Sequence, residues 1–153
     1  MIETAKIEKI ANEYLEGGSV FLVSAKVAAG NKIRLLLDGE GGVRIDHCAK
    51  LSRHIESFFD RQVEDFEIEV SSVGVGTPLV LKRQYGLNIG RTLLIVNNSN
   101  QKVKGKLVEV NHDFIILEKE QPKKMKNDDA EENNRLKINF NEIKETKVQV
   151  SFN

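Results

Sequence analysis

The stretch DFEIEVS, residues 65–71, alternates strictly between polar and apolar side chains. In an extended strand Phe66, Ile68 and Val70 would point to one face and the residues between them to the other. One face of this strand is therefore predicted to be buried and the other to meet water. Such a strand needs neighbouring strands and a layer of helices or strands that covers its apolar face.

Two amphipathic helices and a hairpin are predicted upstream of this strand. Residues 20–23 and 32–37 are extended runs, and the Ala29-Gly30-Asn31 turn between them is typical of a hairpin. The first helix ends at the glycines of positions 17 and 18, and its apolar stripe consists of Ile7, Ile10, Ala11, Tyr14 and Leu15. The second helix is expected to begin with Asp46 as its N-cap, and its apolar face consists of Cys48, Leu51, Ile55, Phe58 and Phe59.

The order helix-strand-strand-helix-strand predicts an N-terminal α/β domain over residues 1–86, with both helices on one face of a three-stranded sheet. Downstream, five short strands are expected to form a small β-barrel over residues 87–153. These strands are predicted at residues 93–96, 103–110, 114–117, 136–140 and 146–152. The polar, highly charged stretch 121–135 is predicted to be a mobile loop within the barrel, and the fold class is α+β.

The composition favours a cytoplasmic protein that binds a partner by local patches of charge. The 23 lysines and arginines equal the 23 aspartates and glutamates, so global charge would not attract nucleic acid. The N-terminus lacks a signal-peptide pattern, and no apolar run approaches the length of a membrane span. The single cysteine fits a reducing compartment.

The reactive side chains do not form a recognisable catalytic or metal-binding pattern, so we expect no enzyme activity, no cofactor and no metal. Cys48 lies on an apolar helix face, which favours a core thiol over a nucleophile. His47 and His54 lack further ligands at a familiar spacing. The Gly74-Val75-Gly76 sequence lacks the third glycine of a dinucleotide fingerprint, which favours a hinge or a partner-contacting turn.

Two clusters of charge are candidate binding surfaces. Lys102, Lys104 and Lys106 would project from one face of a strand at a spacing of about 6.6 Å, near that of phosphates in a nucleic-acid strand. An acidic cluster lies on and beside the strand at 67–71, and it consists of Glu64, Asp65, Glu67 and Glu69. For both clusters a merely solvated face remains the alternative interpretation.

Three stretches resemble the RimP family of ribosome maturation proteins. DHCAKLSR (46–53) is similar to the family's D-x-C-x-x-[VL]-S-R helix signature, and LDGEGGV (37–43) to the strand and turn before it. EVSSVGVGTPL (69–79) is similar to the E-V-S-S-P-G-[LV]-x-R-P-L element. Val73 stands where the family usually has proline, and Thr77 where it has arginine, so no role of that arginine is carried over.

The resemblance implies an SH3-like, Sm-like second domain and binding to the free small ribosomal subunit during its maturation. It also implies ribosomal protein S-twelve as a protein partner. Our hypothesis is a clamp in which the first domain meets a basic ribosomal protein and the barrel meets ribosomal RNA. The predicted protein contacts are Glu67, Glu69, Ser71, Ser72, Gly74, Pro78 and Leu79, and the predicted RNA contacts are Arg91, Lys102, Lys104 and Lys106. The alternative is a freestanding Sm-like RNA-binding regulator.

Overall fold

The computed structural model describes residues 1–74, 76–119 and 134–149. The chain forms two compact units, Met1–Val73 and Gly74–Asn153, and each has its own hydrophobic core. Among the described residues, no helix is long and apolar enough to cross a membrane.

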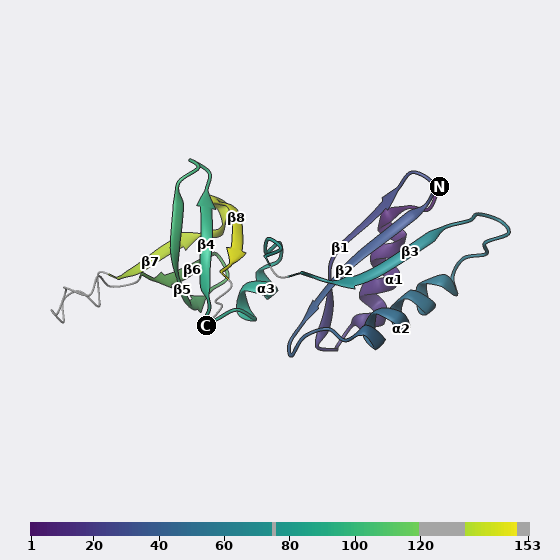
Figure 1. Cartoon of the computed structure of the whole chain (residues 1–153), viewed down its shortest axis with the longest axis horizontal. Helices are drawn as coiled ribbons and strands as arrows, with labels where there is room; N and C mark the ends of the chain where they lie inside the picture. The colour runs from purple at the N-terminus through teal and green to yellow at the C-terminus, as the bar shows by residue number, and fades with distance from the viewer. Residues whose placement is uncertain (75, 120–133, 150–153) are drawn as a thin grey trace. The chain divides into compact units, whose positions relative to one another are not determined.

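The first unit has the predicted order of elements (Figure 1). These are α1 (Thr4–Leu15), β1 (Val20–Ala28), β2 (Lys32–Gly39), α2 (Ile45–Glu56) and β3 (Glu67–Ser72). β1 and β2 form the expected antiparallel hairpin, and β3 pairs in parallel with β2 after the chain crosses over through α2. The central position of β2 explains why its apolar residues are the most deeply buried of the sheet.

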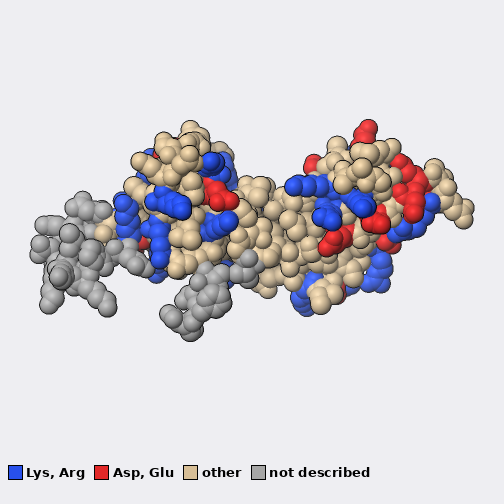
Figure 2. Space-filling view, turned by 45° about the horizontal axis from the view of Figure 1, so that its top comes forward, with Lys and Arg blue, Asp and Glu red and all other residues tan. Residues whose placement is uncertain are grey.

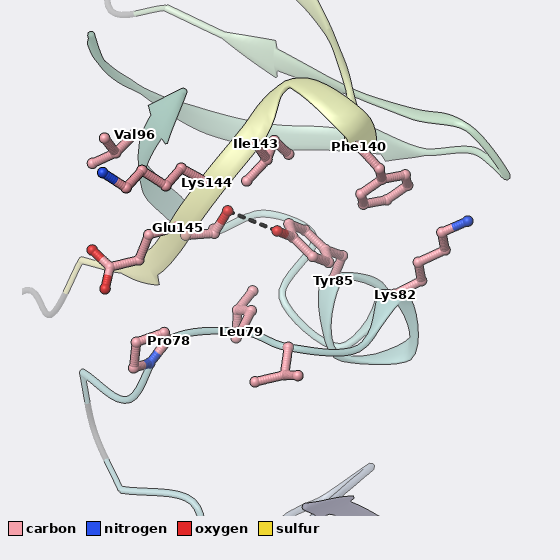
Figure 3. A pocket seen from close by; sticks show the side chains of 11 residues that line it. Pro78, Leu79, Lys82, Tyr85, Val96, Phe140, Ile143, Lys144 and Glu145 are labelled. Atoms are coloured by element: carbon pink, nitrogen blue, oxygen red, sulfur yellow. Dashed lines mark hydrogen bonds between the residues drawn. The ribbon is translucent and has the colours of Figure 1, made fainter. Parts of the chain in front are cut away.

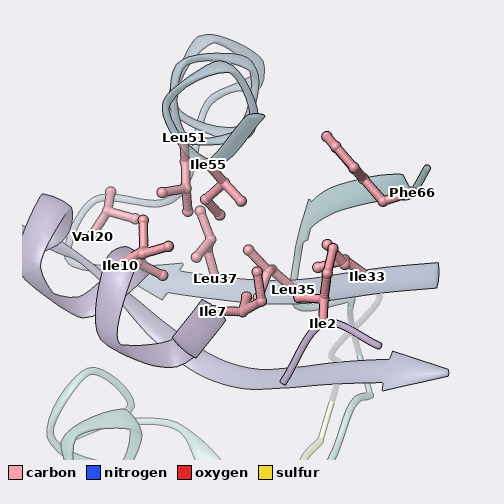
Figure 4. Close-up of a cluster of buried hydrophobic side chains, with 11 residues drawn as sticks. Ile2, Ile7, Ile10, Val20, Ile33, Leu35, Leu37, Leu51, Ile55 and Phe66 are labelled. Atoms are coloured by element: carbon pink, nitrogen blue, oxygen red, sulfur yellow. The ribbon is translucent and has the colours of Figure 1, made fainter. Parts of the chain in front are cut away.

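Both helices cover the same face of this sheet, as predicted. Figure 4 shows the side chains of α1 and α2 meeting those of β2 in one cluster. Ile7 of α1 and Ile55 of α2 are fully buried there, beside Leu37 of β2. Phe66, just before β3, is 2% exposed, which confirms the orientation expected from the alternation of residues 65–71.

The ends of α2 differ from the sequence prediction. The N-cap position belongs to Arg44 and not to Asp46, because the backbone N–H of Arg44 donates to Nδ1 of His47 at 3.0 Å. Asp46 instead lies in the first turn of α2, where its negative charge is favourable near the helix N-terminus. The helix ends at Glu56, so Phe58 falls outside its buried face and is 52% exposed.

The second unit is a five-stranded antiparallel sheet with one short helix before it. Its elements are α3 (Lys82–Gly86), β4 (Thr92–Asn97), β5 (Lys102–Val110), β6 (Phe114–Glu118), β7 (Arg135–Asn139), η1 (Phe140–Glu142) and β8 (Ile143–Val148). The strand order is β7-β6-β5-β4-β8, so the last strand returns to pair with the first. The predicted α+β class is confirmed, and this sheet is consistent with an SH3-like barrel.

The last strand of this unit and its charged loop differ in extent from the sequence prediction. The last strand begins at Ile143 rather than at residue 146, because the turn η1 leads directly into it. The predicted end of that strand (150–152) and residues 121–133 of the predicted charged loop (121–135) lie outside the described residues.

The units divide between Val73 and Gly74, earlier in the chain than the 86/87 boundary expected from the sequence. The segment between these two positions packs with the second core. The N–H of Leu79 donates to the carbonyl oxygen of Thr146 at 2.8 Å, and Tyr85 of α3 is 5% exposed in that core.

Asn31 connects the hairpin of the first unit to the N-terminal residues and to the segment just before β3. Its backbone is left-handed (φ 55) and its side chain is buried. Its Oδ1 accepts the N–H of Ile2 at 2.9 Å, and its Nδ2 donates to Oε1 of Glu64 and to the carbonyl oxygen of Asp65, both at 3.0 Å. Asparagine suits the position because it tolerates left-handed backbone and carries both a donor and an acceptor.

Replacing Asn31 by alanine is therefore expected to lower the free energy of unfolding by about 2–4 kcal/mol, since it adds left-handed strain and leaves buried polar groups without partners. Asn100→Ala is the matched control, because Asn100 is also left-handed (φ 62) but exposed. It should lose only about 1 kcal/mol. Urea denaturation followed by circular dichroism measures both, and equal losses would contradict the importance of the buried network.

Candidate functional site

The three lysines predicted to bind RNA lie along β5, and all are exposed on one side of it: Lys102, Lys104 and Lys106. The positions between them face the core. Gly105 is buried, and a Cβ there would come 3.1 Å from the carbonyl oxygen of Glu118. Leu107, the next inward residue, is fully buried. Burial of these two residues fixes the outward direction of the lysines.

The register of the sheet adds a fourth lysine to this row. Lys104 lies opposite Leu94 of β4, and Leu94 lies opposite Lys147 of β8. Residues that face each other across paired strands lie on the same face of a sheet. Sequence reasoning missed Lys147, because only the pairing of β8 with β4 brings position 147 beside position 104.

The same face continues across β6 and β7. Glu118 lies opposite Lys106 on one side and Arg135 on the other, so it lowers the local charge there. Further along β7, the Nζ of Lys137 lies 4.3 Å from the centre of the Phe114 ring. In Figure 2 the visible face of the second unit carries many more Lys and Arg than Asp and Glu side chains. We refer to the outward face of β5, β4 and β8 as the lysine face.

Arg91 is placed differently from the other predicted RNA contacts. It precedes β4 and pairs through its backbone with Leu107, an inward residue of β5. Strand alternation therefore puts Arg91 on the side opposite to the lysine face. Its Nη1 donates to Oδ1 of the buried Asn88 at 3.1 Å, which commits part of the guanidinium to a contact within the chain.

The acidic cluster seen in the sequence is largely balanced by basic groups in the fold. Glu64 pairs with the N-terminal amine at 3.0 Å, and hydrogen bonds from that amine and from Asn31 lower the pKa of Glu64. Asp65 pairs with Nη1 of Arg61 at 3.2 Å. These two carboxylates therefore serve the structure of the first unit.

Glu67 and Glu69 lie on the open face of the sheet, as predicted, and both are exposed. Parallel pairing sets Glu67 opposite Lys32 and Glu69 opposite Arg34. The Nε of Arg34 is 3.8 Å from the Glu69 carboxylate. This face therefore carries both charges, whereas the sequence of β3 alone shows only its acidic residues.

The remaining predicted protein contacts belong to both units. Ser71 and Ser72 end β3 opposite Leu36 and Leu37 of β2. Gly74, Pro78 and Leu79 belong to the second unit.

Pro78 and Leu79 line a hollow of about 680 Å³ in the second unit (Figure 3). Figure 3 shows the segment 78–82 on one side and β8 on the other, with Tyr85 between them. The hydroxyl of Tyr85 donates to Oγ1 of Thr146 at 2.7 Å, and burial raises the pKa of Tyr85. The other lining residues are Val80, Lys82, Val96, Phe140, Ile143, Lys144 and Glu145.

The side chains considered for catalysis or metal binding have structural contacts. Cys48 is half-buried against the first core, and burial, followed by the charge of Asp46, raises the pKa of its thiol, which disfavours the reactive thiolate. His47 accepts a hydrogen bond at the start of α2, and His54 stacks on Tyr14 with ring centres 4.4 Å apart. The part of the chain that the structure describes contains no group of three His, Cys, Asp or Glu residues suited to a metal ion.

Comparisons with known proteins agree with the motifs in the sequence. Residues 10–76 match the model of the RimP N-terminal domain. A ribosome maturation factor RimP from Porphyromonas gingivalis is 42% identical over 118 residues, covering 77% of this chain and 78% of that protein. Another from Christiangramia forsetii is 36% identical over 150 residues, covering 96% and 97%. A third, from Flavobacterium psychrophilum, is 41% identical over 125 residues, covering 77% and 80%.

The contact between Tyr85 and Thr146 has a testable effect on stability. Tyr85→Phe leaves the buried Thr146 hydroxyl without its donor and should cost about 1–3 kcal/mol, part of which Thr146→Val should restore in the double variant. Because the pKa of Tyr85 is raised in the fold, the unfolded chain loses this proton first as pH rises. The stability difference between wild type and Tyr85→Phe should therefore shrink above about pH 10. Urea denaturation measures the difference in unfolding free energy between the two proteins. A difference that stays constant between pH 8 and 11 would contradict a raised pKa of Tyr85 in the fold.

Proposed function

The chain belongs to the RimP family of ribosome maturation factors, and from this premise we propose that it binds the free small ribosomal subunit during assembly. In this proposal the second unit contacts ribosomal RNA and the first unit contacts a basic ribosomal protein, for which ribosomal protein S-twelve is our candidate. The protein then acts by holding two components of the immature subunit in position. Its role in ribosome maturation follows from the family; the two contacts are our proposal.

The observation that carries the RNA contact is the lysine face. Its lysines on β5 are exposed, and they project from a strand whose other side is fixed in the core. Exposed ammonium groups bind phosphates by charge and release counterions, which requires no base sequence. Arg91, with its guanidinium bonded to Asn88, is a weaker candidate than the lysines.

The protein contact rests on Glu67 and Glu69 of the first unit. Ser71 and Ser72 of that unit are additional contacts, and the second unit would add Gly74, Pro78 and Leu79. Both glutamates are exposed, and neither is buried in an ion pair: the contact of Glu69 with Arg34 joins two side chains that are each more than two-thirds exposed. Such a surface pair contributes little energy and can be exchanged for a contact with a partner. Lys32 and Arg34 would at the same time limit the attraction of this face for a basic protein.

A freestanding RNA-binding regulator is less well supported. Proteins that bind single-stranded RNA stack its bases on exposed aromatic rings. In the described part of the second unit, the ring of Phe114 is covered by Lys137, and Phe140 packs edge-on against Tyr85 with ring centres 5.1 Å apart. Co-sedimentation with free small subunits rather than with heterogeneous RNA would separate the two functions.

Alanine substitution of all three β5 lysines is expected to weaken binding to free small subunits at least tenfold. The logarithm of the affinity should also depend less steeply on the logarithm of salt concentration, by about two to three units of slope. The control removes three exposed lysines of the first unit, Lys9, Lys26 and Lys50, and therefore has the same net charge. If both variants lose affinity equally, the lysine face has no special role and the RNA half of the proposal is wrong.

The double variant Glu67→Lys, Glu69→Lys is expected to slow association with isolated ribosomal protein S-twelve, because it converts an attraction into a repulsion. Stopped-flow or surface-based kinetics at two salt concentrations measure this. The control carries the same charge change on α1, at the exposed Glu8 and Glu13. Unchanged association for Glu67→Lys, Glu69→Lys removes the protein half of the proposal.

A further inference from the structure

Lys147 lies at the level of Lys104 but two strands away. The order β5-β4-β8 places Leu94 between them, so their backbones are about 10 Å apart across the sheet. Both lysines are exposed, and neither takes part in an ion pair within the described residues. The lysine face therefore extends in two directions, along β5 and across to β8.

The strand between the two lysines carries no charge on this face. Its outward residues are Thr92, Leu94 and Val96, and Leu94 is 42% exposed. The acid nearest to Lys147 on the same strand and face is Glu145, which lies opposite Val96, at the level of Lys102. Lys104 and Lys147 thus form two separated positive positions on either side of an uncharged aliphatic strip.

This arrangement suits a ligand with two rows of phosphates better than one with a single row. A single RNA strand is usually held by a charged groove together with aromatic rings for its bases. Here the outward positions of β4 are aliphatic or hydroxyl-bearing, so they offer bases no ring to stack on. Base-paired RNA hides its bases and presents two backbones, and proteins recognise it through its shape, its phosphates and its 2′-hydroxyl groups.

We infer that the lysine face, completed by Lys147, binds the backbones of base-paired RNA, with Lys104 and Lys147 contacting phosphates of opposite strands. This rests on the proposed function and adds to it a fourth cationic residue and the class of RNA. A surface that contacts RNA backbones does not require a particular base sequence. The contact would therefore orient the protein on an RNA helix of the immature subunit.

The matched control for Lys147 lies three residues away on the same strand. Lys144 is also exposed, but its Nζ donates to Oδ1 of Asn100 at 2.8 Å, which holds it at the turn before β5. Lys147→Ala and Lys144→Ala therefore remove the same charge from β8 at two different places.

The experiment measures fluorescence anisotropy of the full chain with a labelled 16-base-pair RNA duplex and with one of its strands alone, over a series of salt concentrations. We expect the wild type to bind the duplex at least fivefold more tightly than the single strand. Lys147→Ala should reduce affinity for the duplex about three- to tenfold and lower the salt slope by about one. Lys144→Ala should change the affinity less than twofold.

Equal binding of the single strand and the duplex by the wild type would overturn the inference, and so would equal effects of the two lysine variants. The proposed function has a separate test, because the β5 variant is measured on free small subunits. Suppose that the β5 triple variant fails to bind subunits while Lys147→Ala retains full affinity for the duplex. The role of the β5 lysines is then supported, and only the role inferred for Lys147 is wrong.

Discussion

The direction of the charged side chains depends above all on strand alternation: one face of each strand is buried, so every second residue points outward. In β5, the burial of Gly105 and Leu107 leaves the lysines between and beside them no direction except outward. A shift of the strand by one residue would bring charged side chains into the second core, where an unpaired charge is very costly. The core of the second unit therefore holds the lysine face in place. In the same way, the burial of Ile33 and Leu35 in β2 turns Lys32 and Arg34 toward the glutamates of β3.

Local sequence patterns predict which face a residue occupies, but not which residues are its neighbours on that face. The alternation of residues 65–71 and the stripe of α1 indicate their buried sides because each depends on one element only, although Tyr14 of that stripe is 42% exposed. The balance of charge around Glu69 depends on pairing with Arg34, 35 residues earlier, and the position of Lys147 depends on the return of β8 to β4. Register of this kind is set by tertiary contacts. One sequence therefore shows the acidic cluster without the basic residues opposite it, and it does not show that Lys147 lies beside Lys104.

The start of α2 differs from the prediction for another reason: more than one residue near the helix N-terminus can serve as its cap. Asp46 is a favourable N-cap by type, but the N-cap is Arg44, whose N–H contacts His47, so the helix begins two residues earlier than predicted. The boundary between the units depends on tertiary contacts instead. The turn residues after β3 and the short helix α3 carry no strong periodicity, and only the contacts of Leu79 and Tyr85 with the second core assign them to the second unit.

These contacts also connect the start of the second unit to the lysine face. Thr146 is fully buried; its carbonyl oxygen accepts the N–H of Leu79, and its hydroxyl accepts that of Tyr85. Lys147 follows immediately and points to the other side of β8, so the two hydrogen bonds that hold Thr146 inward also hold Lys147 outward. The segment 78–85 begins with the last two residues of the stretch that resembles the RimP element (69–79), and through Thr146 it helps to position Lys147. A change in the packing of Leu79 or Tyr85 would consequently shift β8 and the position of Lys147 on the lysine face, without altering any charge on that face.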